Sequence, residues 1–146
     1  MNFDQSKPVL VTGATGYVAG RLVEKLLNEG LTVHAAVRQP NNDEKLKYLN
    51  ALAENAKGTI KYFQADLLDI GSYDEAMHGC QVVFHTASPF VRNVNDPQKD
   101  LVDPAKLGTR NVLESAYRVG SVERVVVTSS CAAIYGDAAD TLSMPN

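Results

Sequence analysis

The chain has 146 residues, 45% of them hydrophobic and 21% charged, with a formal net charge of -3 at pH 7. This composition is typical of a globular protein with one hydrophobic core, and it excludes disordered and fibrous classes. The Lys and Arg residues form no basic run, the apolar runs are too short to cross a bilayer, and the first residues lack a signal-peptide pattern. We therefore expect a cytoplasmic protein that binds neither nucleic acid nor membrane.

The first part of the chain alternates between strand and helix patterns. A β-branched apolar run over residues 8–14 predicts a strand that is buried on both faces. Residues 16–30 repeat Val and Leu at helical spacing and end in glycine, which predicts a helix. A second strand is expected over 31–38, and a second helix over 41–58, with Asn and Asp as candidate caps.

The same alternation continues to the other end of the chain. The remaining predicted elements are a strand over 59–66, a short helix over 69–79, a strand over 80–89, a helix over 98–120 and a strand over 122–130. Pro104 either kinks the long helix or starts it afresh. We therefore predict an α/β fold, a Rossmann-type doubly wound parallel sheet of about five strands, in one domain over residues 1–146. Binding residues are expected just after the strands.

A glycine-rich turn follows the first predicted strand. Its pattern is T-G-x-x-G-x-x-G, with Gly13 for a tight turn, Gly16 for close backbone approach and Gly20 for close helix-to-strand packing. Such a turn lets a pyrophosphate lie on the positive end of the next helix. The spacing differs by one residue from G-x-G-x-x-G and lacks the lysine of a P-loop. Dinucleotide binding is the prediction, a purely structural turn is the alternative, and the other candidate contacts here are Thr15, Tyr17 and Val18.

The end of the second predicted strand indicates which dinucleotide is bound. Chains that bind NAD usually place Asp or Glu there, to hold the ribose 2′-hydroxyl. This strand ends in "HAAVRQP", so Arg38 stands where a 2′-phosphate would lie, and Lys45 adds a second positive charge. NADP(H) is therefore favoured over NAD(H). The alternative for both side chains is an ordinary solvated surface position.

The ends of the third and fourth predicted strands carry further candidates. Asp66 can accept a hydrogen bond from the adenine amino group and Leu67 can donate one through its backbone, although Asp66 can instead cap a helix. Small residues after the fourth strand would let the backbone pass close to the cofactor: Thr86, Ala87 and Ser88. We interpret His85 as a hydrogen-bonded strand-end histidine, not as an acid, a base or a metal ligand. Neither cysteine has metal-site or C-x-x-C spacing, so no metal site is predicted.

Six segments resemble one superfamily, and together they cover nearly the whole chain: "VTGATGYVAG", "VRQPNND", "ADLLD", "VFHTASPF", "GTRNVLESA" and "RVVVTSSCAAIYGD". They resemble the extended short-chain dehydrogenase/reductase superfamily, the NAD-dependent epimerase/dehydratase family. The Val-Arg after the second strand and the Ala-Ser-Pro after the fourth are most similar to dihydroflavonol reductases and cinnamoyl-CoA reductases. Nucleotide-sugar epimerases and dehydratases share the glycine turn, but they commonly carry an acidic residue after the second strand.

The resemblance implies hydride transfer between NADPH and the carbonyl group of a small molecule. In such enzymes a serine after the fifth strand binds the substrate oxygen, a tyrosine transfers its proton, and a lysine four residues on lowers the pKa of the tyrosine. Ser130 matches that serine, with Ser129 as the open alternative, and either can instead cap backbone groups. No tyrosine of this sequence, Tyr135 included, has a lysine four residues later.

These features lead to one main expectation and two alternatives. The chain is expected to be the N-terminal, cofactor-binding part of a carbonyl reductase, without the C-terminal substrate-binding part and inactive on its own. A short non-catalytic protein that binds NADP(H), as a sensor or an interaction module, is the first alternative. A fragment of a nucleotide-sugar epimerase or dehydratase is the second. The substrate and the oligomeric state stay open.

Overall fold

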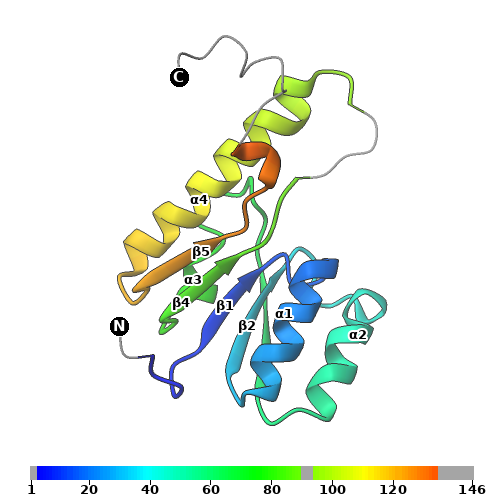
Figure 1. Ribbon diagram of the computed structural model, residues 1–146, viewed down its shortest axis with the longest axis vertical. Coiled ribbons are helices and arrows are strands. Elements are labelled where there is room, and N and C mark those ends of the chain that lie inside the picture. The colour runs from blue at the N-terminus through cyan, green and yellow to red at the C-terminus, as the bar shows by residue number, and fades with distance from the viewer. Residues whose placement is uncertain (1–2, 90–93, 135–146) are drawn as a thin grey trace, which may run out of the picture.

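One parallel sheet organises the chain, in a computed structural model that describes residues 3–89 and 94–134. The strand order is β3-β2-β1-β4-β5, with every neighbouring pair parallel (Figure 1). The strands are β1 (Val9–Thr12), β2 (Thr32–Val37), β3 (Thr59–Gln64), β4 (Val82–His85) and β5 (Arg124–Val127). The predicted α/β, doubly wound parallel sheet is therefore confirmed.

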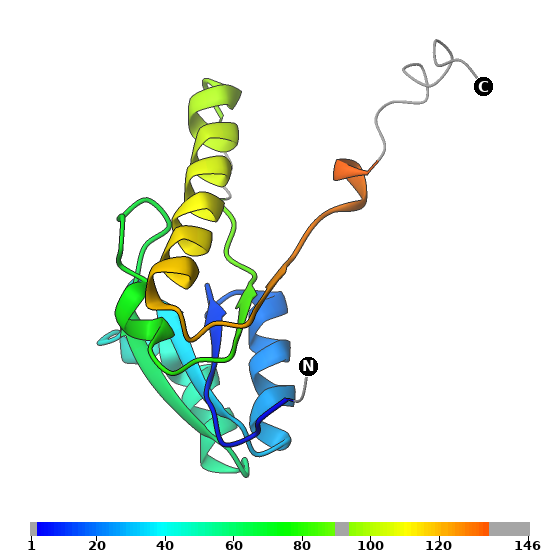
Figure 2. The same ribbon diagram turned by 90° about the vertical axis from the view of Figure 1, so that its left-hand side faces the viewer.

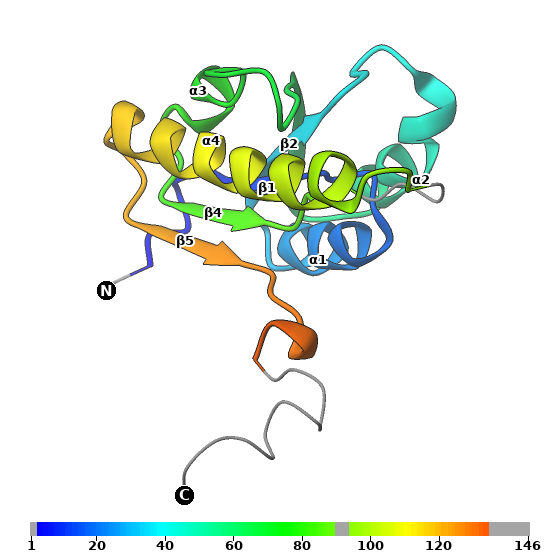
Figure 3. The ribbon, with the colours of Figure 1, turned by 90° about the horizontal axis from the view of Figure 1, so that it is seen from above.

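Helices cover both faces of this sheet. They are α1 (Tyr17–Asn28), α2 (Asp43–Glu54), α3 (Asp74–Met77) and α4 (Asp103–Val119), with a π-helical turn η1 (Gln98–Val102) and a 3-10 turn η2 (Cys131–Ala133). Figure 3 shows α1 and α2 on one face and α3 and α4 on the other. No helix in residues 3–89 and 94–134 has the length and hydropathy needed to span a membrane.

The core is divided into two layers by the alternating side chains of the central strand. Val9 and Val11 of β1 belong to the cluster under α1 and α2, and Leu10 belongs to the cluster under α3 and α4. All three are fully buried, because a strand with helices on both sides has no solvent-facing side. Each such side chain stabilises the fold by about 1.5–3 kcal/mol. This burial explains why the strands read as continuous apolar runs.

The winding of the chain reverses between β1 and β4. From β1 the chain adds β2 and then β3 on one side, and it then crosses over to add β4 and β5 on the other side of β1. In open α/β sheets, ligands bind beyond the carboxyl ends of the strands at such a switch point. Thr12 and His85, the last residues of β1 and β4, are paired in register there.

Two predicted helices differ in detail from the observed ones. The long helix begins with the π-turn η1, and Pro104 lies in the first turn of α4, the part of an α-helix that tolerates proline best. Pro104 therefore starts the regular α-helix afresh. The helix expected over 69–79 is reduced to Asp74–Met77, because Gly71 adopts a left-handed φ of 82° in the turn before it.

Candidate functional site

The glycine turn between β1 and α1 is tight. Gly13 has a φ of 63°, and a Cβ atom on it would lie 3.0 Å from the Cα and Cβ atoms of Ala87. The backbone N–H of Gly16 donates to the carbonyl of Gly13 at 2.9 Å, and a Cβ atom on Gly16 would lie 3.2 Å from that same oxygen. Glycine is therefore favoured at Gly13 by its left-handed backbone, and a Cβ atom at either position would be tightly packed.

Gly20 has a different role from the predicted one. A Cβ atom there would lie 3.0 Å from Cε1 and 3.5 Å from Cδ1 of the Tyr48 ring. Tyr48 lies on α2, so the close contact joins two helices. The predicted helix-to-strand packing at Gly20 is wrong. Helix α2 packs beside α1 on the same face of the sheet, and it places the Tyr48 ring against the glycine.

The first two residues of α1 are exposed, and its first turn contains no acidic residue. Gly16 is its N-cap, no side chain caps the turn, and no acidic residue lies in it. Thr15, Tyr17 and Val18 are exposed, Tyr17 by 87%. Helix α2 is the opposite case, because the side chain of Asn42 caps it and two acidic residues follow. The N-terminus of α1 thus presents backbone N–H groups and the positive end of a helix dipole to solvent, which suits an anion.

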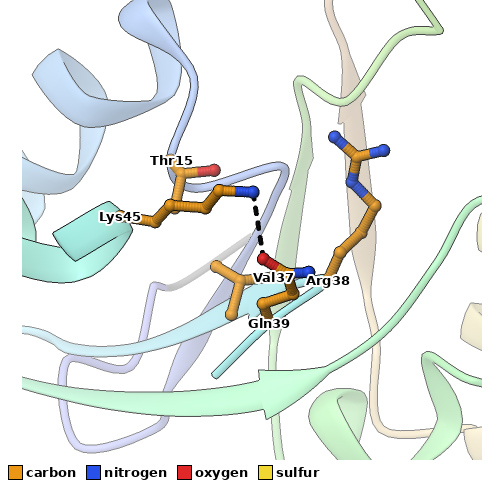
Figure 4. Close-up of a pocket in the computed structure, with 5 residues that line it drawn as sticks. All are labelled: Thr15, Val37, Arg38, Gln39 and Lys45. Carbon is orange, nitrogen blue, oxygen red and sulfur yellow. Dashed lines mark hydrogen bonds between the residues drawn. The ribbon is translucent and has the colours of Figure 1, made fainter. Parts of the chain in front are cut away.

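A hollow with two cations lies beside this turn, and we name it the Lys45 hollow. Its lining residues are Thr15, Val37, Arg38, Gln39 and Lys45 (Figure 4). Lys45 Nζ donates to Gln39 Oε1 at 2.9 Å, while the guanidinium of Arg38 extends away from that pair, as Figure 4 shows. None of the five lining residues is acidic, so the hollow is electropositive.

A second hollow, the Asp66 hollow, lies on the other side of Arg38. It is lined by Arg38, Gln64, Ala65, Asp66, Asp69, Gly71, Ser72 and Glu75. Asp66 Oδ1 accepts from the backbone N–H of Leu68 at 2.9 Å, and the Asp66 N–H donates to Ser72 Oγ at 3.1 Å. Asp66 therefore caps a turn that precedes α3, while its carboxylate also lines the hollow. Arg38 is the residue that the two hollows share.

The segment after β4 is held against the glycine turn. The backbone N–H groups of Thr86 and Ala87 both donate to Thr12 Oγ1 at 3.1 Å, and the Thr86 hydroxyl donates to the carbonyl of Thr12. Ser88, the next residue, is exposed. The predicted strand-end residues Thr86 and Ala87 therefore lie directly behind Gly13, because β1 and β4 are neighbours in the sheet.

His85 is a buried histidine with partners at both ring nitrogens. Its Nδ1 lies 2.8 Å from Thr12 Oγ1 and its Nε2 lies 3.4 Å from Thr109 Oγ1. Burial lowers the pKa of the His85 imidazole, since the charged form loses its hydration. Its interpretation as a hydrogen-bonded strand-end residue agrees with these contacts. Across residues 3–89 and 94–134, no three His, Cys, Asp or Glu side chains form a group that could hold a metal ion.

The two candidate serines follow β5 at the same edge of the sheet. Ser129 and Ser130 are both exposed, and the carbonyl of Ser130 accepts from the Ala133 N–H at 3.0 Å in the turn that forms η2. Figure 2 shows this segment leading away from the sheet. Tyr135, the tyrosine nearest to these serines in sequence, lies outside the described residues.

Sequence reasoning missed the polar residues that fix the loops of the site. Asn111 of α4 is 4% exposed; its Nδ2 donates to the carbonyls of Leu67 and Asp69, and its Oδ1 accepts from the Gly71 N–H. It thereby holds the loop that forms the Asp66 hollow. An asparagine on the buried side of an amphipathic helix was the available signal, because buried amides need partners. Gln39, which contacts Lys45, had no such signal.

Comparison with known proteins places this geometry in a family. The NAD dependent epimerase/dehydratase family model matches residues 9–145. The chain is 51% identical over 126 residues to cinnamoyl-CoA reductase CAD2 of Medicago truncatula, covering 86% of this chain and 38% of the relative. It is 42% identical over 127 residues to dihydroflavonol 4-reductase of Hordeum vulgare, covering 87% of this chain and 36% of the relative.

A solved structure supports the same placement. The chain is 37% identical to Gre2 from Candida albicans, whose crystal structure is a complex with NADPH, with a TM-score of 0.72 over 87% of this chain and 38% of that chain. The chain thus spans well under half the length of the relatives it matches. The expected resemblance to cinnamoyl-CoA and dihydroflavonol reductases is confirmed, and the chain belongs to the NAD dependent epimerase/dehydratase family.

Proposed function

We propose that this chain is the NADP(H)-binding part of a carbonyl reductase of the cinnamoyl-CoA and dihydroflavonol reductase type. The observation that carries the proposal is the Lys45 hollow, where two cations and no carboxylate lie beside the glycine turn. The names of the relatives support a reductase, and the NADPH complex of Gre2 supports the cofactor. The bound nicotinamide would supply or accept the hydride, and the residues of this chain would hold and orient the dinucleotide.

The pyrophosphate is proposed to lie over the glycine turn. Gly13 and Gly16 leave no side chain in the way, and the uncapped first turn of α1 directs its N–H groups outward. The contacts come from Thr15, Tyr17 and Val18, which are all exposed at that end of the helix. Gly20 contributes indirectly, by letting α2 pack close enough to α1 to bring Lys45 beside the turn.

The 2′-phosphate is proposed to lie between Arg38 and Lys45. The guanidinium offers a planar set of donors, and the ammonium adds a point charge from the opposite side of the Lys45 hollow. Gln39 holds Lys45 in place through its Oε1. NADH has no group for these two cations, so NADPH is the better ligand.

The adenine is proposed to enter the Asp66 hollow. Asp66 would accept from the adenine amino group and the Leu67 backbone would donate to the ring, while Arg38 covers the base from the shared side. Thr86, Ala87 and Ser88 would follow the cofactor toward its nicotinamide end. This orientation is consistent with β4 lying between β1 and β5, the strand that the candidate serines follow.

Ser130, with Ser129 as its alternative, is proposed to bind the substrate oxygen in the complete reductase. The 146 residues contain no Tyr-x-x-x-Lys pair to move the proton. We therefore expect the chain alone to bind NADP(H) without turning over a carbonyl substrate. The same sequence feature suits the alternative of a non-catalytic NADP(H)-binding module, and a measurable reductase rate that disappears in Ser130→Ala would exclude that alternative.

Calorimetric titration with NADPH and NADH tests the cofactor assignment. We expect NADPH to bind at least about tenfold more tightly, because two charge-assisted contacts to one phosphate are each worth about 1.5–3 kcal/mol. Lys45→Ala should weaken NADPH binding by about tenfold and leave NADH binding nearly unchanged. Arg38→Ala should weaken NADPH binding by about tenfold or more and NADH binding by less, because Arg38 is also proposed to cover the adenine that both cofactors carry. Lys47→Ala is the matched control, since Lys47 is an exposed lysine of the same helix that does not line the hollow. Equal affinities for the two cofactors, or equal effects of the three variants, would contradict the assignment.

A further inference from the structure

A buried cluster of hydroxyl and imidazole groups lies at the switch point between β1 and β4. Thr12, His85 and Thr109 form a chain across it, with Oγ1 to Nδ1 at 2.8 Å and Nε2 to Oγ1 at 3.4 Å. Thr12 and His85 are 0% and 3% exposed. The cofactor proposal uses neither residue, although Thr12 also holds the segment after β4.

The protons in this cluster can be placed by counting donors and acceptors. A hydroxyl oxygen has two lone pairs and one hydrogen. Both lone pairs of Thr12 Oγ1 are used, because the backbone N–H groups of Thr86 and Ala87 donate to it. The hydroxyl hydrogen therefore points to His85, so Nδ1 of His85 must be an acceptor. The ring proton is left on Nε2, where it donates to Thr109 Oγ1.

We infer that His85 is a positioning residue: as the neutral Nε2–H tautomer it orients the Thr12 hydroxyl, which then holds the Thr86 and Ala87 backbone behind the glycine turn. Ala87 is the residue that a Cβ atom at Gly13 would meet at 3.0 Å, so the turn and this segment share one contact. The consequence for the cofactor rests on the proposed function, because the glycine turn is the proposed pyrophosphate site. The tautomer itself does not depend on that proposal.

Protonation of His85 would reverse the arrangement. A proton added at Nδ1 would face the Thr12 hydroxyl, whose lone pairs are occupied and whose hydrogen would lose its acceptor. Thr12 would have to release a backbone N–H of the segment after β4. The two hydrogen-bond partners of the ring are neutral, namely Thr12 on β1 and Thr109 on α4. His85 also pairs with Val127 in the β5 ladder, and its carbonyl accepts from the Thr128 N–H. Burial of the ring lowers the pKa of His85.

His34 provides an internal comparison, because its proton lies on the other nitrogen. Its Nδ1 lies 2.7 Å from the carbonyl oxygen of Ala76, which can only accept, so His34 carries its proton on Nδ1. Burial lowers the pKa of His34 and the bond to Ala76 opposes that shift. A second proton would enter at Nε2 and leave that bond intact. Acid should therefore disturb the glycine turn through His85 and not through His34.

Nitrogen NMR of the imidazole rings tests the tautomer without any ligand. Long-range ¹H–¹⁵N spectra of the full chain at pH 7.5 should show Nδ1 unprotonated in His85 and protonated in His34. The backbone amide signals of Thr86 and Ala87 should move with the titration of His85 as the pH is lowered. A proton on Nδ1 of His85, or Thr86 and Ala87 amides that do not follow its titration, would overturn the inference even if NADPH does not bind.

The pH dependence of NADPH affinity tests the consequence with three variants. His85→Asn keeps a hydrogen-bond acceptor that does not titrate. The NADPH affinity of this variant at pH 7.5 should therefore stay within about threefold of wild type, and it should fall less than that of wild type as the pH is lowered. His85→Leu removes the acceptor and should weaken binding about tenfold at every pH. His34→Asn should keep the wild-type profile. An unchanged acid loss in His85→Asn would refute the positioning role, whereas absence of NADPH binding in wild type would refute the proposed function alone.

Discussion

Replacing Gly13 by alanine should destabilise the chain more than the backbone conformation alone explains. Gly13 has a left-handed φ of 63°, which costs about 1–2 kcal/mol for a residue with a Cβ atom. Its Cβ atom would also lie 3.0 Å from the backbone of Ala87, which cannot easily retreat because Thr12 Oγ1 accepts its N–H. Overpacking of this kind costs about 1–3 kcal/mol more. These two costs sum to about 2–5 kcal/mol, and about 0.4–1 kcal/mol of that is offset because alanine also restricts the unfolded chain.

Gly79→Ala is the matched control for this substitution. Gly79 has a similar left-handed φ of 75°, and, within the part of the chain that the structure describes, a Cβ atom there would meet no non-neighbouring residue within 4 Å. The conformational cost applies without the overpacking, and the offset from the unfolded chain is the same as for Gly13→Ala, so it cancels from the comparison. Urea unfolding followed by circular dichroism gives both free energies at 25 °C. If Gly13→Ala were no less stable than Gly79→Ala, the close contact with Ala87 would carry no energy and the reasoning would fail.

Two further predictions concern buried polar groups. Asn111→Asp should lower the free energy of unfolding at pH 7.5 by about 3 kcal/mol, since a carboxylate would face the carbonyls of Leu67 and Asp69 in place of a donor. Urea unfolding measures this free energy. A loss below about 1 kcal/mol would contradict donation from the Asn111 amide to those two carbonyls. The second prediction follows from the lowered pKa values of His34 and His85. Below a pH of about 6.5 the unfolded chain binds protons at these histidines, whereas in the folded chain they stay neutral. The free energy of unfolding should therefore be constant above that pH. Below it, the free energy of unfolding should fall by up to about 1.4 kcal/mol per pH unit for each histidine. His34→Asn should reduce that slope, and a stability that rises as the pH falls from 6.5 would contradict it.

The sequence alone was enough for the fold class, and it predicts the side of the sheet on which the candidate site lies. Apolar runs that end in glycine or proline alternate with helical spacing, and that alternation specifies parallel strands with crossover helices. The position of Arg38 just after the second strand follows from the same pattern, because the carboxyl ends of parallel strands share one edge. Both are local features, readable from neighbours a few residues apart.

Tertiary structure decided which distant residues meet. Thr12 and His85 are 73 positions apart, and they touch only because β4 pairs with β1, which hydrophobic periodicity does not specify. The same holds for Gly20, whose partner proved to be Tyr48 of α2 instead of a strand. Spacing along the chain determines which side of a strand or helix is buried, whereas the identity of the atom 3 Å away depends on strand order and helix packing. The sequence therefore predicts the edge of the sheet where the candidate site lies, whereas the hydrogen bonds that fix the loops at that edge depend on the tertiary fold.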